Sequence, residues 1–192
     1  DKETCVIEVA EASGLLLLSR NEQNPLKAST YGTGELILHA LNRGYRRFII
    51  GLGGSATNDG GTGILKALGM KLLTKEGEEI SNGGAGIGEL HEIDFRHFDE
   101  RISESEFIIA CDVENPLVGP EGASFVFGPQ KGATTEMIKL LDLNLTKFAN
   151  VVKRHTGFSL HEKNGAGAAG GAGGEFQAFF PSELKQGISV VL

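Results

Sequence analysis

The chain has 192 residues, 40% of them hydrophobic, and a formal net charge of −7. The acidic balance argues against a non-specific nucleic-acid binder, which needs a basic surface. No apolar run approaches the roughly 18 residues of a membrane helix. The two cysteines, Cys5 and Cys111, are expected to be reduced thiols in a cytoplasmic protein.

Strand-like and helix-like segments alternate in the first part of the chain. The patterns predict, in order, strand 4–10, helix 34–43, strand 47–52, helix 60–68 and hairpin 70–80. Thr33 is the expected N-cap of the first helix, and Lys75-Glu76-Gly77 is the expected tip of the hairpin.

The alternation continues to the C-terminal end. The patterns predict, in order, strand 106–111, a short strand over 123–127, helix 135–154, a helix from about 170 to 180 and a strand over 188–192. Helix 135–154 is the clearest, because Leu141, Leu145 and Phe148 recur at helical spacing and Thr134 can cap its start. The order predicts an α/β fold, a mixed sheet with helices, with residues 1–192 as a single domain.

Glycine is the abnormal feature of the composition, with 28 residues of 192. Six lie within residues 51–63, four within 83–88 and six within 165–174. Clusters of this kind mark places where the backbone turns sharply or is approached closely by another group. They therefore point to a small number of tight turns or ligand-contacting loops.

The cluster at residues 51–63 lies between a predicted strand and a predicted helix. Backbone N–H groups in such a loop form a natural site for an anion. Gly53 and Gly54 would let phosphate oxygens come close to the backbone. The loop also offers side-chain donors, which are Ser55, Thr57 and Asn58.

Asp59 is the only ionisable residue of this loop. A bare carboxylate beside a phosphate would repel it, so a functional Asp59 would hold Mg²⁺ or accept the proton of a substrate hydroxyl. The alternative is that Asp59 only caps the helix at 60–68. Spacing alone leaves both interpretations open.

The start of the loop also fits the dinucleotide pattern G-x-G-x-x-A over residues 51–56. In that motif the helix begins at once against the strand. Here residues 57–61, which are poor helix formers, intervene. A dinucleotide-binding domain is therefore a lesser alternative.

Three further segments could contribute to a site. Asp112 and Asn115 follow a predicted strand, where α/β sheets bind ligands, and could bind metal or substrate hydroxyls; an ordinary turn before Pro116 is the alternative. Lys131 could neutralise a phosphate or be a solvated surface lysine. Residues 165–174 could contact a phosphate or an adenine through the backbone, or allow close helix packing.

Several of these segments together resemble the bacterial glycerate kinases. The resemblance lies in the stretches 53–61, 110–118, 127–133 and 165–174, and in Asn24-Pro25-Leu26 followed by residues 30–36. Four or five motifs in the right order along the whole chain are far more specific than any one of them.

The resemblance implies ATP-dependent phosphorylation of D-glycerate, at the 2-hydroxyl, with Mg²⁺. It implies Asp59 as catalytic base or orienter of the hydroxyl, and Asp112 as a candidate Mg²⁺ ligand. Substrate or phosphate would be held by Gly53, Gly54, Ser55, Thr57, Asn58, Asp112, Asn115 and Lys131.

Members of this family are longer, two-domain α/β enzymes with one domain inserted in the other. The resemblance implies that this chain corresponds mostly to the inserted domain. The family's N-terminal Asp-Ser-Phe-Lys motif and C-terminal glycine- and lysine-containing motif are absent from these 192 residues. The chain alone is therefore expected to be catalytically incomplete. A non-catalytic α/β ligand-binding module is the main alternative.

Overall fold

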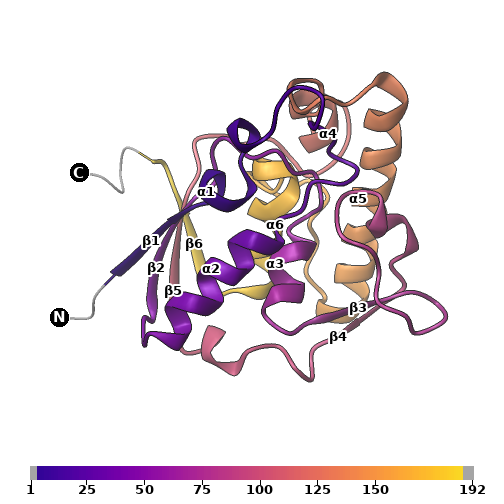
Figure 1. The fold of residues 1–192 in the computed structure, drawn as a ribbon. Coiled ribbons are helices and arrows are strands. Elements are labelled where there is room, and N and C mark those ends of the chain that lie inside the picture. Colours follow the sequence, from indigo (N-terminus) through magenta and orange to yellow (C-terminus); the bar gives the residue numbers. More distant parts are fainter. Residues whose placement is uncertain (1–3, 188–192) are drawn as a thin grey trace.

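The computed structural model describes residues 4–187 and has a four-stranded parallel sheet at one side of the molecule (Figure 1). The strand order is β1 (Thr4–Glu8), β2 (Arg47–Gly51), β5 (Glu106–Ala110) and β6 (Ser182–Lys185). The predicted α/β class and the strands at β1, β2 and β5 are confirmed. β6 was not predicted, and the strand expected over 188–192 lies outside the described residues.

The two central strands carry the aromatic centre of the core. Phe48 of β2 and Phe107 of β5 are register partners, and their rings stack with centroids 4.7 Å apart. Both side chains are buried, with Phe176 and Phe180 packed beside Phe107. The same register pairs Gly51 with Ala110, so the carboxyl ends of β2 and β5 lie side by side and the loops that follow them start together.

Within residues 4–187, six α-helices pack beside the sheet and extend away from it. They are α1 (Val9–Ser13), α2 (Tyr31–Asn42), α3 (Thr62–Ala67), α4 (Ala123–Phe127), α5 (Thr135–Thr156) and α6 (Ala172–Phe179). Short 3₁₀ turns lie at Leu15–Leu17, Gly86–Glu89, Glu100–Ile102, Pro129–Lys131 and Ala168–Gly171. In Figure 1, α3 lies between the parallel sheet and α5.

The long helix α5 confirms its prediction closely. The Thr134 side chain accepts a hydrogen bond from the Met137 backbone, and Gly157, with φ of 77°, ends the helix. The apolar residues at helical spacing face inward and are buried. No helix within residues 4–187 is both long and apolar enough to cross a membrane.

Helix α2 begins three residues before its predicted start. Thr33 lies inside the helix, and Thr30 holds the cap position. Gly34 serves close packing, because a Cβ there would be 2.6 Å from Ala67 Cβ on α3. In return, a Cβ at Gly63 of α3 would be 2.3 Å from the Tyr31 nitrogen. Glycine on both helices therefore lets α2 and α3 cross closely.

Replacing Gly63 with alanine should destabilise the protein. The new methyl group would collide with backbone at Tyr31, so the helices must separate, at a cost of at least about 2 kcal/mol in the free energy of unfolding. Urea denaturation of the full natural polypeptide measures this. Gly53→Ala is the control, since nothing lies within 4 Å of a Cβ at Gly53. Equal midpoints for the two variants would contradict the close crossing.

The strand predicted over 123–127 is wrong, because this segment forms helix α4. Its aromatic and β-branched residues favour a strand locally, but the burial does not alternate: Ala123 and Ser124 are buried, whereas Phe125 and Val126 are exposed. Ser124 hydrogen-bonds the Asn58 side chain. Tertiary contact has overridden local propensity here.

The hairpin predicted over 70–80 is only partly formed. The tip exists, with Gly77 at φ of 84° and a hydrogen bond from Thr74 N to Glu78 O. However, β3 (Lys71–Leu73) pairs with β4 (Glu92–Asp94) in an antiparallel two-stranded sheet. The returning segment contributes an isolated bridge at Glu79, because the chain then turns into the glycine cluster at 83–88.

Candidate functional site

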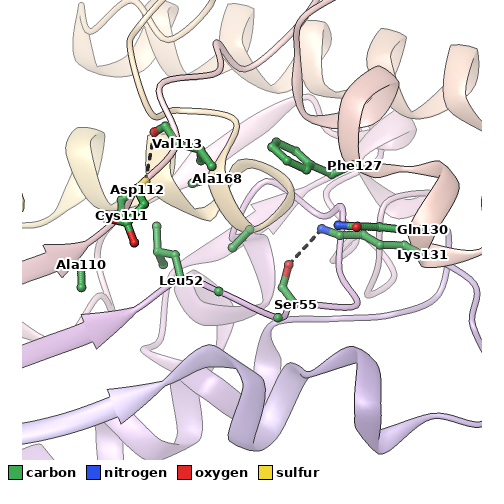
Figure 2. A pocket seen from close by; sticks show the side chains of 13 residues that line it. Leu52, Ser55, Ala110, Cys111, Asp112, Val113, Phe127, Gln130, Lys131 and Ala168 are labelled. Carbon is green, nitrogen blue, oxygen red and sulfur yellow. Dashed lines mark hydrogen bonds between the residues drawn. The ribbon is translucent and has the colours of Figure 1, made fainter. Parts of the chain in front are cut away.

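A cavity of about 250 Å³ opens at the carboxyl ends of β2 and β5 (Figure 2). This is the edge at which parallel α/β sheets usually bind ligands. Its lining residues are Leu52, Gly53, Gly54, Ser55, Ala110, Cys111, Asp112, Val113, Phe127, Gln130, Lys131, Ala168 and Ala169. The loop after β2, the loop after β5, the turn after α4 and the glycine segment before α6 thus converge on one space.

The loop after β2 presents bare backbone to this cavity. Gly53 and Gly54 are exposed, and a Cβ at Gly53 would meet nothing within 4 Å. Gly54 has φ of 73°, a left-handed conformation that favours glycine. A Leu15 N–H donates to Gly54 O at 2.8 Å and ties the loop to the segment after α1. A ligand can therefore approach the loop closely without displacing side chains.

Lys131 supplies a buried positive charge at the wall of the cavity. Its side chain runs from the turn after α4 and is 3% exposed. The Nζ atom donates to Ser55 Oγ at 2.9 Å and to Thr57 O at 2.7 Å, and Figure 2 shows it pointing toward Ser55. Burial lowers the pKa of Lys131 to about 8, with the nearby Asp59 opposing that shift.

Asp59 lies beneath the same loop and does not line the cavity. It is fully buried, and its Oδ2 accepts from the Thr30 backbone at 2.8 Å, from Thr30 Oγ1 at 3.0 Å and from Gly63 N at 3.4 Å. Its Oδ1 accepts from Gly61 N at 3.2 Å. Burial raises the pKa of Asp59, and these hydrogen bonds oppose the rise. The carboxylate joins the glycine-rich loop to the starts of α2 and α3.

Two further loop residues also point into the protein. Asn58 exchanges hydrogen bonds with Ser124 of α4, with its Nδ2 donating at 2.9 Å. The Thr57 hydroxyl donates to Ala169 O at 3.5 Å. Of the three side-chain donors that the sequence suggested, only Ser55 lines the cavity. The other two anchor the loop to its neighbours.

The glycine segment at 165–174 packs directly against this loop. Gly60 N donates to Gly170 O at 2.9 Å, and a Cβ at Gly170 would be 2.0 Å from Thr57 O. Ala169 has φ of 49°, the one left-handed non-glycine residue within residues 4–187, and it lines the cavity. Strained backbone of this kind is often found at functional sites. The segment therefore combines close packing with a wall of the cavity.

The sequence profile of the glycerate kinase family matches residues 1–192, the whole chain. The chain belongs to the glycerate kinase family. It is 49% identical over 192 residues to a glycerate kinase of Bacillus subtilis, and 49% identical over 191 residues to a glycerate 2-kinase of Escherichia coli. Each of these alignments spans the whole of this chain and 50% of the relative.

A solved structure agrees with this membership. The crystal structure of a Salmonella typhimurium LT2 protein assigned as glycerate kinase 2 superposes with a TM-score of 0.96 at 48% identity. The match covers 98% of this chain and 50% of that one. The chain therefore spans about half the length of the glycerate kinases that it matches.

The loop after β5 brings one of its two predicted glycerate kinase site residues to the cavity. Asp112 lines it and accepts a hydrogen bond from Gly187 N at 2.7 Å. Asn115 instead donates to Glu121 O at 2.8 Å within its own loop. Within residues 4–187, no group of three or more His, Cys, Asp or Glu side chains gathers in a way that could hold a metal ion.

Sequence reasoning missed two residues at this site. Thr30 binds Asp59 twice, although it lies in a stretch that already resembled the family. Glu175 lies fully buried at the end of the glycine segment. The available signal was a single charged residue between Gly174 and the apolar Phe176, on the short helix predicted from about 170 to 180.

Proposed function

We propose that this chain forms part of the active site of an ATP-dependent glycerate kinase that phosphorylates D-glycerate at its 2-hydroxyl. The buried ammonium group of Lys131 at the cavity wall carries the proposal. It lies beside the bare backbone of Gly53 and Gly54, so a cation and open N–H groups face one space. The names of the relatives, which include a glycerate 2-kinase, support the substrate and the position.

The cavity fits the phosphate end of a nucleotide or the carboxylate and hydroxyls of glycerate. Phosphoryl transfer requires positioning and neutralisation of charge more than covalent help from the protein. Lys131 keeps one N–H beyond the two that it donates to Ser55 and Thr57. That N–H and the loop backbone can hold an anionic oxygen in a partly desolvated place, where such contacts are strong.

Mg²⁺ would be held mainly by the nucleotide phosphates. Sites of this kind commonly use one or two protein carboxylates in addition. Asp112 is the one carboxylate that lines the cavity within residues 4–187, so we assign it as the protein ligand. The ion would neutralise charge on the transferring phosphoryl group. The second domain implied by the length of the relatives would supply the remaining contacts.

For Asp59 we propose a contribution to catalysis through the loop. Its oxygens accept four hydrogen bonds, from Thr30, Gly61 and Gly63, so it ties the end of the glycine-rich loop to the starts of α2 and α3. Through this anchor it would hold the rest of the loop in place. A direct role as base would require one of those bonds to open toward the glycerate hydroxyl. Both versions keep Asp59 as the carboxylate on which turnover depends.

A coupled ADP-release assay tests the proposed reaction. D-glycerate, ATP and Mg²⁺ are supplied to the full natural polypeptide and, in parallel, to the 192-residue chain. We expect glycerate-dependent ADP release from the full polypeptide and little or none from the chain alone. Identification of the product as 2-phosphoglycerate by NMR establishes the position. A folded full polypeptide that releases no ADP with glycerate would overturn the assignment.

A further inference from the structure

Glu175 on α6 is a buried carboxyl group without a hydrogen-bond partner. The residue is 0% exposed, and within residues 4–187 neither Oε1 nor Oε2 has a donor or acceptor. A buried charged group without a partner is very costly, so such a group normally becomes neutral or has a function. The proposed reaction gives Glu175 no direct part.

The position of Glu175 connects it to the glycine-rich loop. A Cβ at Gly61 would be 2.6 Å from Glu175 Cβ and 2.7 Å from its Oε2, so the side chain lies flat against the Gly61 backbone. The adjacent turn is also fixed to the glycine segment, because Gly60 N donates to Gly170 O. Glu175 therefore occupies the space directly behind the turn that carries Asp59.

Asp59 and Glu175 have opposite surroundings within one buried region. Asp59 accepts four hydrogen bonds, which favour its ionised form, whereas Glu175 accepts none. Burial raises the pKa of Glu175 well above its usual range, and the neighbouring Asp59 raises it further. Paired carboxyl groups with such different environments normally divide the two roles, one charged and one neutral.

We propose that Glu175 is a positioning residue that packs on Gly61 as a neutral acid. Because Glu175 carries no charge, Asp59 remains the single negative charge behind the anion-binding loop. Ionisation of Glu175 would place a second negative charge against the Gly60–Gly61 turn, beside Asp59 and in the same loop as Gly53 and Gly54. Anionic ligands would then bind more weakly. The inference rests on the proposed role of the loop in binding anions.

Other charges near α6 do not compensate for Glu175. The 3₁₀ turn at Ala168–Gly171, which packs on α6, carries only alanine and glycine. On the neighbouring β6, Glu183 and Lys185 pair with each other at 3.1 Å near the surface. Lys131 acts on the same region through Asp59. Asp59 is thus the charge that governs Glu175 directly.

The first test is the dependence of stability on pH in the full natural polypeptide. A carboxyl group with a raised folded-state pKa contributes stability below its unfolded pKa of about 4.3, and that contribution is lost as pH rises through the folded value. Glu175→Gln is neutral at every pH and nearly isosteric. It should match wild type near pH 4 and melt about 2 °C or more higher at pH 8. Glu162→Gln, at an exposed position, is the control and should track wild type.

The second test is binding of ATP by titration calorimetry at a pH below and a pH above the point at which the melting difference between wild type and Glu175→Gln stops growing, which marks the folded-state titration of Glu175. The loss of affinity between these pH values should be at least about threefold greater for wild type than for Glu175→Gln, while the deprotonation of Lys131 affects both equally. If the melting temperatures of wild type and Glu175→Gln change with pH in the same way, the proposal that Glu175 is a neutral acid is wrong. A difference in melting without a difference in binding would overturn its link to the loop. If neither protein binds ATP, the proposed function fails and the melting test still decides the state of Glu175.

Discussion

Asp59→Asn should lower both the stability and the turnover of the full natural polypeptide. Asparagine keeps the shape of the side chain but replaces one acceptor oxygen with an NH₂ group. That NH₂ would face N–H groups of Thr30, Gly61 or Gly63, so at least one buried donor loses its partner. The expected cost is on the order of 2 kcal/mol in the free energy of unfolding.

The fall in kcat of Asp59→Asn should be larger than its loss of folding stability alone would cause. If Asp59 fixes the loop or accepts the proton of the hydroxyl, kcat falls at least about a hundredfold. Steady-state kinetics with glycerate and urea denaturation measure the two effects on one preparation. Asp142→Asn is a matched control, because Asp142, half-buried on α5, also accepts a backbone N–H, from Gly119 at 2.9 Å. It should change neither quantity much.

The two measurements on Asp59→Asn separate its possible roles. A stability loss with near-normal kcat would reduce Asp59 to a residue that caps and joins α2 and α3. A kcat loss with unchanged stability would contradict the hydrogen-bonded geometry and favour a free base. Loss of both supports the proposed coupling of loop position to catalysis.

The sequence predicted the sheet better than the contacts of the site. Strands β2 and β5 contain the short apolar runs 48–50 and 107–109, which predicted strands from composition alone. In the structure one face of each strand is buried and the other is half-buried. The strand prediction for residues 123–127 failed because burial, and not local propensity, decides the structure of this segment. That burial depends on the long-range contact of Ser124 with Asn58. Local patterns carry no information about such a partner.

The same limit applies within the site. Ser55 and Asp112 each follow a predicted strand, and the structure places both at one cavity, because the carboxyl ends of parallel strands meet. It could not show that Asn58 turns inward, because that depends on a side chain far along the chain. The burial of Glu175 against Gly61 likewise follows from folding the glycine segment onto the loop. The α/β class and most of the strands could be predicted, whereas side-chain direction could not.

Lys131→Met should remove most of the catalytic efficiency with a smaller effect on folding. Methionine has a similar unbranched shape, so packing is largely kept. Removal of the ammonium takes away the cation proposed to face the ligand, and kcat/KM should fall about a hundredfold or more. Lys139→Met, on the exposed face of α5, is the control and should behave as wild type. Near wild-type kcat/KM in Lys131→Met would remove Lys131 from the proposed site.

The pH profile gives an independent test of the same cation. Because the pKa of Lys131 is lowered to about 8, its charge is present below that pH and is lost above it. Wild-type kcat/KM should therefore fall as pH rises through about 8, and Lys131→Met should lack this descending limb. Stability has the opposite sign. The folded state binds fewer protons than the unfolded state between the lowered pKa and the ordinary lysine value, so this group makes the fold more stable as pH rises across that window. A decline in activity that coincides with a local gain in stability would thus identify Lys131, because general unfolding at high pH would lower both.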